Sequence, residues 1–158
     1  MRYFLVDKVT EIHPGERVRG VKNVSLSDPI LHDHFPDHPI FPGVLIIESA
    51  AQLAGFLLEV TFNTSEAPPL RAVLAQIQQA KFYEVSGPGD QLDIVVTLES
   101  EIETAARVIA TAHVGEKRIA RAELVFAMRD IPSDRIHEQR RYIYKLWTRE
   151  LDLPFPIR

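Results

Sequence analysis

The chain has 158 residues, of which 46% are hydrophobic, 25% charged and 8% aromatic, as expected for one globular domain and not for a disordered chain. It has 0 cysteines, which excludes disulfides, thiolate zinc sites and cysteine nucleophiles. With 18 Lys and Arg against 22 Asp and Glu, the formal net charge of -4 argues against a general nucleic-acid binder. The N-terminus lacks the features of a secretory signal, so we expect a cytoplasmic protein.

The first half of the chain predicts two strands and one long helix. The strands are expected at 3–12 and 17–24, which are rich in β-branched and aromatic residues. Residues 28–42 contain four of the 11 prolines and are expected to form no regular element. The helix is expected at 43–60. Its apolar residues occupy the whole circumference and two glutamates interrupt them, which indicates a buried helix rather than a membrane span.

The second half of the chain has the two-residue period of strands. Strands are predicted at 91–100, 107–114 and 118–128, with a hairpin connection at 115–117. A further strand is predicted at 74–82, although its glutamines and alanines are poor strand formers. Five or six mostly antiparallel strands and one helix together indicate an α+β fold in which the sheet wraps around the helix.

The C-terminal residues differ from the rest. We expect a domain over residues 1–130 and an amphipathic extension over 131–158, packed on or beside that domain. Three apolar residues can share one face of a helix in the extension: Ile136, Ile143 and Trp147. Two interpretations of its basic outer face stay open. It is a capping helix with a solvated surface, or a patch that receives an acidic partner or a phosphate group.

The segment from His32 to Pro42 is the most unusual, because three histidines, two aspartates and three prolines lie directly before the predicted helix. A metal site would use His32 and His34, but no distant cluster of His, Asp or Glu obviously completes a coordination sphere. An exposed polyproline ligand fits the proline spacing, yet the apolar Phe35 and Phe41 lead into a buried helix. In the third interpretation, a stiff loop delivers one histidine to the start of the helix.

That third interpretation supplies the parts of an acid–base reaction. His34 is a natural base near neutral pH, and Glu48, in an apolar run, is expected to be protonated and to donate a proton. Gly43 presents a free N–H at the head of the helix to an oxygen that gains charge, and Gln52 can orient Glu48 from one turn away. These parts describe proton abstraction next to a carbonyl with loss of a leaving group. A glutamate satisfied by structural hydrogen bonds is the alternative.

The residues from His34 to Gln52 match a known signature, reading HFPxxPIFPGVLIIExxAQ. Further matches lie at 3–9, 22–25, 81–82, 88–92 and 122–127. This pattern closely resembles the signature of the FabZ/FabA-type 3-hydroxyacyl-[acyl-carrier-protein] dehydratases, over roughly residues 3–128. The resemblance implies a hotdog fold, an antiparallel sheet around one long central hydrophobic helix, that works as a homodimer; assembly into a hexamer is left open.

The resemblance also implies roles for single residues. His34 falls on the catalytic histidine of the family, Glu48 on its catalytic acid, Gly43 on the glycine that polarises the thioester carbonyl, and Gln52 on the glutamine that supports the acid. Glutamate at position 48, where FabA-type enzymes have aspartate, looks like FabZ and implies dehydration without isomerisation. In the family, the histidine and the acid come from opposite subunits.

The implied reaction converts (3R)-3-hydroxyacyl thioesters to trans-2-enoyl thioesters in fatty-acid, polyene or polyketide synthesis. The family implies an apolar tunnel for the acyl chain, and Phe41 and Phe82 are the predicted contributors. The acyl group is expected to arrive on the phosphopantetheine of acyl carrier protein, with no metal, redox cofactor, nucleic acid or membrane involved. The alternatives are a hotdog acyl-thioester hydrolase and a non-catalytic acyl-binding homologue.

Three features depart from the family pattern. The family usually has a short helix before the stretch that begins at Tyr3, a glycine in place of Asp33, and a shorter tail after about Asp130. A carboxylate at position 33, next to His34, is expected to favour the protonated histidine. These departures leave the acyl chain length, the pathway and the assembly open.

Overall fold

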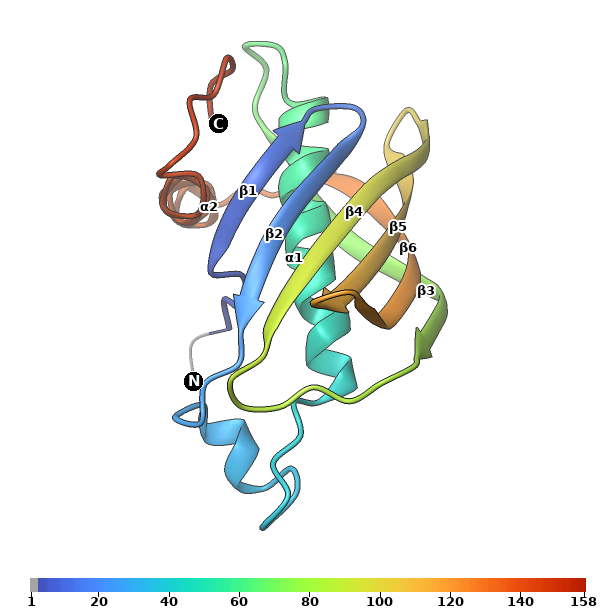
Figure 1. Ribbon diagram of the computed structural model, residues 1–158. Coiled ribbons are helices and arrows are strands. Elements are labelled where there is room, and N and C mark those ends of the chain that lie inside the picture. Colours follow the sequence, from blue (N-terminus) through green and yellow to red (C-terminus); the bar gives the residue numbers. More distant parts are fainter. Residues whose placement is uncertain (1–2) are drawn as a thin grey trace.

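A six-stranded antiparallel sheet curves around one long helix, α1, in the computed structural model, which describes residues 3–158 (Figure 1). The strand order is β1-β2-β4-β5-β6-β3, so β1 and β3 are the two edges. The strands are β1 Lys8–His13, β2 Arg17–Asn23, β3 Leu70–Phe82, β4 Gln91–Ile102, β5 Ala105–Val114 and β6 Lys117–Asp130. The predicted α+β fold, a sheet around a helix, is confirmed.

Helix α1, Gly43–Phe62, is the centre of the core and extends slightly beyond its predicted end. By length and composition it could cross a membrane, but 67% of its most apolar window is buried inside the protein. The sheet approaches it closely at Gly20, where an added Cβ would lie 3.0 Å from Cδ1 of Leu53. The prediction of a buried helix is therefore confirmed. The apolar residues around the circumference of α1 pack inside the protein.

The first strand is shorter than predicted, because β1 begins at Lys8 and residues 3–7 lie outside the sheet. The side chain of Gln52 on α1 holds this segment. Its amide oxygen accepts from the N–H of Leu5 at 2.9 Å, and its amide nitrogen donates to the carbonyl of Tyr3 at 2.7 Å. A strand and an extended segment outside the sheet have the same sequence pattern. The contacts with Gln52, which are distant in sequence, therefore decide that residues 3–7 are not part of β1.

Strand β3 is longer than predicted, starting at Leu70 instead of residue 74. It pairs with β6 from Leu70 opposite Asp130 to Phe82 opposite Ala120. Pairing with a well-formed neighbour outweighs the poor strand propensity of its alanines and glutamines. Most of β3 is exposed, because no strand formed by residues 3–158 pairs with its other side.

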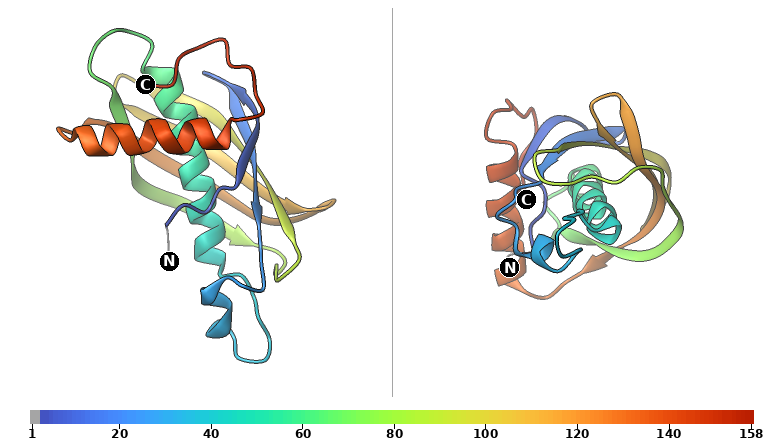
Figure 2. Two further views of the ribbon diagram at one scale, coloured as in Figure 1. Left: turned by 90° about the vertical axis from the view of Figure 1, so that its left-hand side faces the viewer. Right: turned by 60° about the horizontal axis from the view of Figure 1, so that its bottom comes forward.

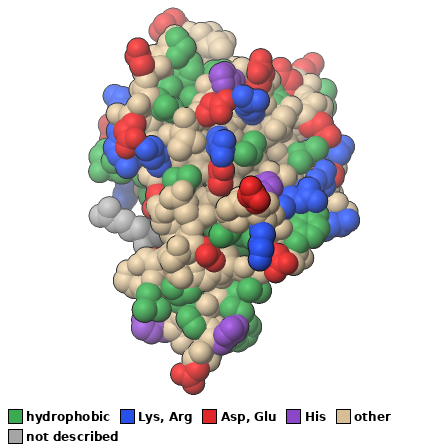
Figure 3. Space-filling model, viewed as in Figure 1, with side chains coloured by type: hydrophobic (Ala, Val, Ile, Leu, Met, Phe, Trp, Pro, Cys, Tyr) green, Lys and Arg blue, Asp and Glu red, His purple; other side chains and the backbone are tan. Residues whose placement is uncertain are grey.

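The proline-rich segment contains one short regular turn that was not predicted, a 3-10 helix η1 at Pro29–His32. The turn forms because Leu31 donates its N–H to the carbonyl of Asp28 at 3.0 Å and buries its side chain. The rest of the segment is irregular, as expected. In Figure 3, histidines and hydrophobic side chains gather at the end of the molecule where this loop lies.

A second helix, α2 Asp134–Trp147, lies across α1 on the side that the sheet leaves open (Figure 2). Tyr144 and Trp147 pack against Phe56 of α1, with ring centroids 4.6 Å and 6.5 Å apart. Ile143 is buried as predicted, but Ile136 is 37% exposed. The apolar face therefore runs through the last turns of α2, because the first turns extend beyond α1 (Figure 2).

Buried polar side chains join α1, β3 and α2. Glu59 and Arg71 form an ion pair at 2.7 Å with only 3% of each side chain exposed. Arg71 also donates through Nε to Nδ1 of His137 at 2.9 Å. Burial and the nearby Glu59 carboxylate raise the pKa of Tyr144 well above its usual range, so the phenol stays neutral. These contacts anchor α2 to the core.

Candidate active site

His34 is held so that, among the described residues, only one of its ring nitrogens has a hydrogen-bond partner. Its Nδ1 lies 2.8 Å from the carbonyl oxygen of Ile40, and its ring stacks on Phe35 with centroids 4.4 Å apart. A carbonyl oxygen only accepts hydrogen bonds, so Nδ1 carries the proton in the neutral ring. Nε2 is then left with a lone pair and can take a proton from a substrate.

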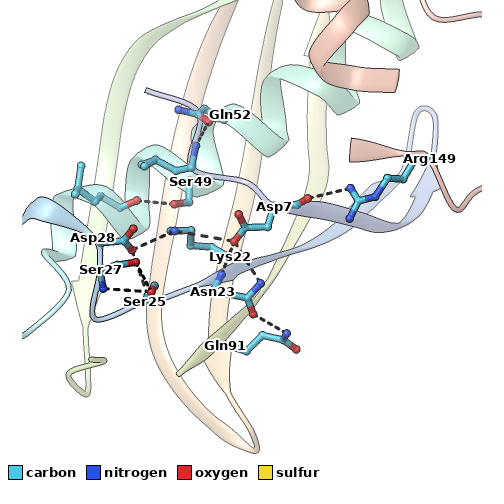
Figure 4. Close-up of polar contacts among 12 residues, drawn as sticks. Asp7, Lys22, Asn23, Ser25, Ser27, Asp28, Ser49, Gln52, Gln91 and Arg149 are labelled. Atoms are coloured by element: carbon cyan, nitrogen blue, oxygen red, sulfur yellow. Dashed lines mark hydrogen bonds and ion pairs between the residues drawn. The ribbon is translucent and has the colours of Figure 1, made fainter. Parts of the chain in front are cut away.

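The loop that carries His34 is anchored on both sides. After it, Phe41 donates its N–H to the carbonyl of Ser86 at 2.8 Å and buries its ring. Before it, the carboxylate of Asp28 forms an ion pair with the ammonium of Lys22, with Oδ2 3.5 Å from Nζ (Figure 4). Lys22 is itself only 8% exposed and lies 5.8 Å from the centroid of the Phe41 ring. These contacts give the irregular loop a defined conformation.

Gly43 and Phe82 are brought together at the head of α1. Hydrogen bonds in this first turn run from the N–H groups of Leu45 and Ile46 to the carbonyl of Pro42, and within residues 3–158 the N–H of Gly43 has no acceptor. A Cβ on Gly43 would lie 2.8 Å from Cε1 of Phe82, so only glycine lets this ring approach. The free N–H at the positive end of the helix is suited to an oxygen that gains negative charge.

The two predicted tunnel residues lie in different surroundings. Phe41 belongs to the core and is 2% exposed, whereas Phe82 is 50% exposed at the end of β3. Phe82 is therefore available to a ligand in this chain. A role of either ring in an acyl tunnel stays a prediction.

Glu48 and Gln52 make the hydrogen bond that their spacing indicates, with Nε2 of Gln52 donating to Oε1 of Glu48 at 2.9 Å. The hydrogen bonds of Gln52 to Tyr3 and Leu5 orient its amide so that the NH2 group faces Glu48. The bond from Gln52 to the N-terminal segment is drawn in Figure 4. Nothing in the sequence pattern of residues 3–7 indicated this support, because it is a main-chain contact.

Glu48 opens into a groove of about 1060 Å³. Residues 3–7 form one wall and α2 forms the other, with Glu48 and Gln52 between them. The sequence did not indicate that α2 borders the site; its amphipathic pattern showed only that it packs against something. No hydrogen bond joins Glu48 to His34 among the described residues of one chain.

The alternative metal site finds no support in the side-chain geometry. Across residues 3–158, no group of three His, Asp or Glu side chains is arranged to hold a metal ion. His32 and His38 are exposed on the loop, and only His34 of the three is partly buried.

Comparisons with known proteins agree with this geometry. A family model described as a FabA-like domain matches residues 1–123. The chain belongs to this family. It is 40% identical over 126 residues to the 3-hydroxyacyl-[acyl-carrier-protein] dehydratase FabZ of Caldanaerobacter subterraneus, covering 80% of this chain and 87% of the relative. The FabZ of Dechloromonas aromatica is 37% identical over 129 residues, covering 82% and 90%. Within the family, the chain is of the FabZ type.

Solved structures show the same fold at low identity. Cj0977, a virulence protein from Campylobacter jejuni, superposes with a TM-score of 0.63 at 16% identity, covering 83% of this chain and 89% of that one. The acetyl-CoA-bound smu.793 of Streptococcus mutans gives 0.62 at 17% identity, covering 80% and 90%. The FabZ-type chain thus has the hotdog fold, as predicted. Helix α2 begins after the part that the FabA-like family model matches.

Proposed function

We propose that the protein dehydrates (3R)-3-hydroxyacyl thioesters to trans-2-enoyl thioesters. The observation that carries this proposal is the hydrogen bond from Nδ1 of His34 to the carbonyl of Ile40, which leaves Nε2 as a base in a FabZ-type chain. The reaction serves fatty-acid synthesis or a related polyene or polyketide pathway in the cytoplasm.

The reaction follows from three groups. Nε2 of His34 takes the proton from C2 of the substrate, and the C–H electron pair forms the C2–C3 double bond. The C3–O bond breaks as Glu48 protonates the departing hydroxyl, which leaves as water. Meanwhile the N–H of Gly43 stabilises the charge on the thioester oxygen. Proton transfer from the histidine back to the carboxylate then restores both groups.

The substrate is delivered by a protein carrier in this proposal. The acyl group is attached to the phosphopantetheine of acyl carrier protein, as the names of the FabZ relatives indicate. The acid–base pair does the chemistry, and no metal or redox cofactor takes part. Phe41 and Phe82 are the proposed contributors to the acyl tunnel.

The working unit in this proposal is a homodimer joined along β3. This edge strand exposes apolar side chains that a monomer leaves in water: Val73, Leu74, Ile77, Phe82 and the following Tyr83. Exposed edges of this kind are suited to pairing with another strand. Two copies paired there would let His34 of one chain and Glu48 of the other share a site.

Glu48→Gln tests the proposed reaction. The glutamine keeps the size of the side chain and can still bond to Gln52, but it cannot protonate the hydroxyl. We expect kcat for enoyl formation from 3-hydroxyacyl carrier protein to fall about 100-fold or more. Glu66→Gln, at an exposed loop position, is the matched control and should leave kcat unchanged.

The same assay separates the alternatives. Free thiol released from the wild-type reaction without enoyl product would identify a hydrolase and refute the dehydration proposal. Substrate that binds without turnover would identify an acyl-binding homologue. Enoyl product from wild type and its loss in Glu48→Gln support the proposal.

Ile77→Lys tests the dimer. Ile77 is 49% exposed in one chain, so lysine there should leave the monomer folded while placing a charge in the paired edge. We expect a shift from dimer to monomer mass by light scattering, and loss of turnover with it. The control is Ile102→Lys. Ile102 is 74% exposed and lies in β4, away from β3, so this variant should keep the dimer mass and the turnover of the wild type. An unchanged mass for Ile77→Lys would refute pairing through β3.

A further inference from the structure

Arg140 of α2 lies at the junction of two hollows beside Glu48. It lines the groove of about 1060 Å³ together with Glu48 and Gln52. The same three side chains line a second cavity of about 280 Å³, which extends below α2 between α1 and β3. Volumes of this size are typical of small-molecule sites. Arg140 therefore borders both hollows together with Glu48.

Among residues 3–158, no hydrogen bond or ion pair joins the guanidinium of Arg140 to another residue. Its Nε is buried, and within residues 3–158 it makes no hydrogen bond. Nor does any carboxylate of the described residues form an ion pair with it. Buried donors are rarely left unpaired, and the cost of one attached to a cation is high. Among the side-chain nitrogens of Arg140, only Nε is one of the buried unpaired atoms, so the two terminal nitrogens are the ones that can meet an acceptor on an occupant of the groove.

The remaining walls of the groove are suited to a chain of carbon atoms. Phe4, Leu146 and Trp147 present apolar surface, and the aromatic rings of Tyr3 and Tyr142 face the same space. A plain alkyl chain would fill this surface but would offer no acceptor to the terminal nitrogens of Arg140. An acyl chain that carries an oxygen atom would satisfy both the apolar walls and the guanidinium.

We propose that α2 forms a specificity wall for the acyl chain, and that Arg140 selects chains that carry an oxygen acceptor, such as a carbonyl, hydroxyl or carboxylate, beyond C3. This inference rests on the proposed dehydration, because it places the reacting carbons beside Glu48. Neither Phe41 nor Phe82 lines the groove, so the groove would hold the part of the acyl chain beyond the tunnel proposed at those rings. It concerns a helix outside the residues that the FabA-like family model matches. Arg140 is a specificity-determining residue and takes no part in proton transfer.

The test compares 3-hydroxyacyl carrier-protein substrates of equal length that end in a methyl group, a ketone or a carboxylate. For the wild type we expect kcat/KM to favour the oxygenated chains by about 10-fold, the worth of one hydrogen bond to a charged group. In Arg140→Met this ratio should fall to about one, through KM more than kcat. Arg141→Met, at the exposed neighbouring position, is the control and should keep the wild-type ratio.

The possible results of this test lead to different conclusions. A preference of the wild type for the plain chain, or an equal loss with all substrates in Arg140→Met, would overturn the specificity role. A ketone and a carboxylate favoured alike indicate recognition of an oxygen, whereas carboxylate alone indicates recognition of charge; both support the proposal. If the wild type dehydrates no substrate, the proposed function fails. Binding of the matching unreactive acyl-pantetheines, by calorimetry, then still tests whether Arg140→Met removes the preference.

Discussion

His34→Ala is expected to lower kcat for dehydration by about a thousandfold while the protein stays folded. A positioned general base contributes roughly 100-fold to 10,000-fold. In the structure, the carbonyl of Ile40 holds Nδ1 and leaves Nε2 as the free basic atom of the ring. Alanine removes that atom but leaves the main-chain bond from Ile40 N–H to the carbonyl of residue 34, at 2.8 Å, in place. Steady-state kinetics on a 3-hydroxyacyl carrier-protein substrate measures the loss.

The matched control for this variant is His38→Ala in the same loop. His38 is exposed, and its bonds with Phe35 run through the main chain, so alanine keeps them. We expect kcat close to the wild-type value. Near-normal turnover in His34→Ala, with the circular dichroism spectrum of the wild type, would remove His34 from the mechanism.

Arg71→Met is expected to lower the free energy of unfolding by about 3–5 kcal/mol. Removing one partner of a buried ion pair leaves the other charge buried and uncompensated, which typically costs this much. Here the carboxylate of Glu59 would be left with 3% of its side chain exposed. Because whole domains are stable by only about 5–15 kcal/mol, the change should be plain in urea unfolding at fixed protein concentration.

Two further variants show whether burial is the cause. Arg19→Met breaks the ion pair with Asp93, in which 50% of the arginine side chain is exposed, and should cost less than about 1 kcal/mol. The double variant Arg71→Met/Glu59→Leu removes both buried charges and should be more stable than Arg71→Met alone. A double variant no more stable than the single one would show that the uncompensated charge is not the source of the loss.

The strength of local patterns explains which elements were predicted well. Helix α1 and strands β4 to β6 have complete apolar periods within their own residues, and their predicted bounds differ little from the observed ones. The start of β1 and the length of β3 depend on partners distant in sequence. Gln52 holds residues 3–7 out of the sheet, and β6 extends β3. Neither the start of β1 nor the length of β3 can therefore be predicted from residues that are neighbours in the sequence.

By itself the sequence determined the residue types of the site, an excess of proline before a buried helix, and the absence of cysteine chemistry. The motif from His34 to Gln52 is contiguous, so its spacing could be recognised without coordinates. Only the tertiary structure decided which nitrogen of His34 is free, that Phe82 covers Gly43, and that Arg140 lies beside Glu48. These contacts join residues far apart in the chain, and their geometry depends on how the sheet and α2 enclose α1.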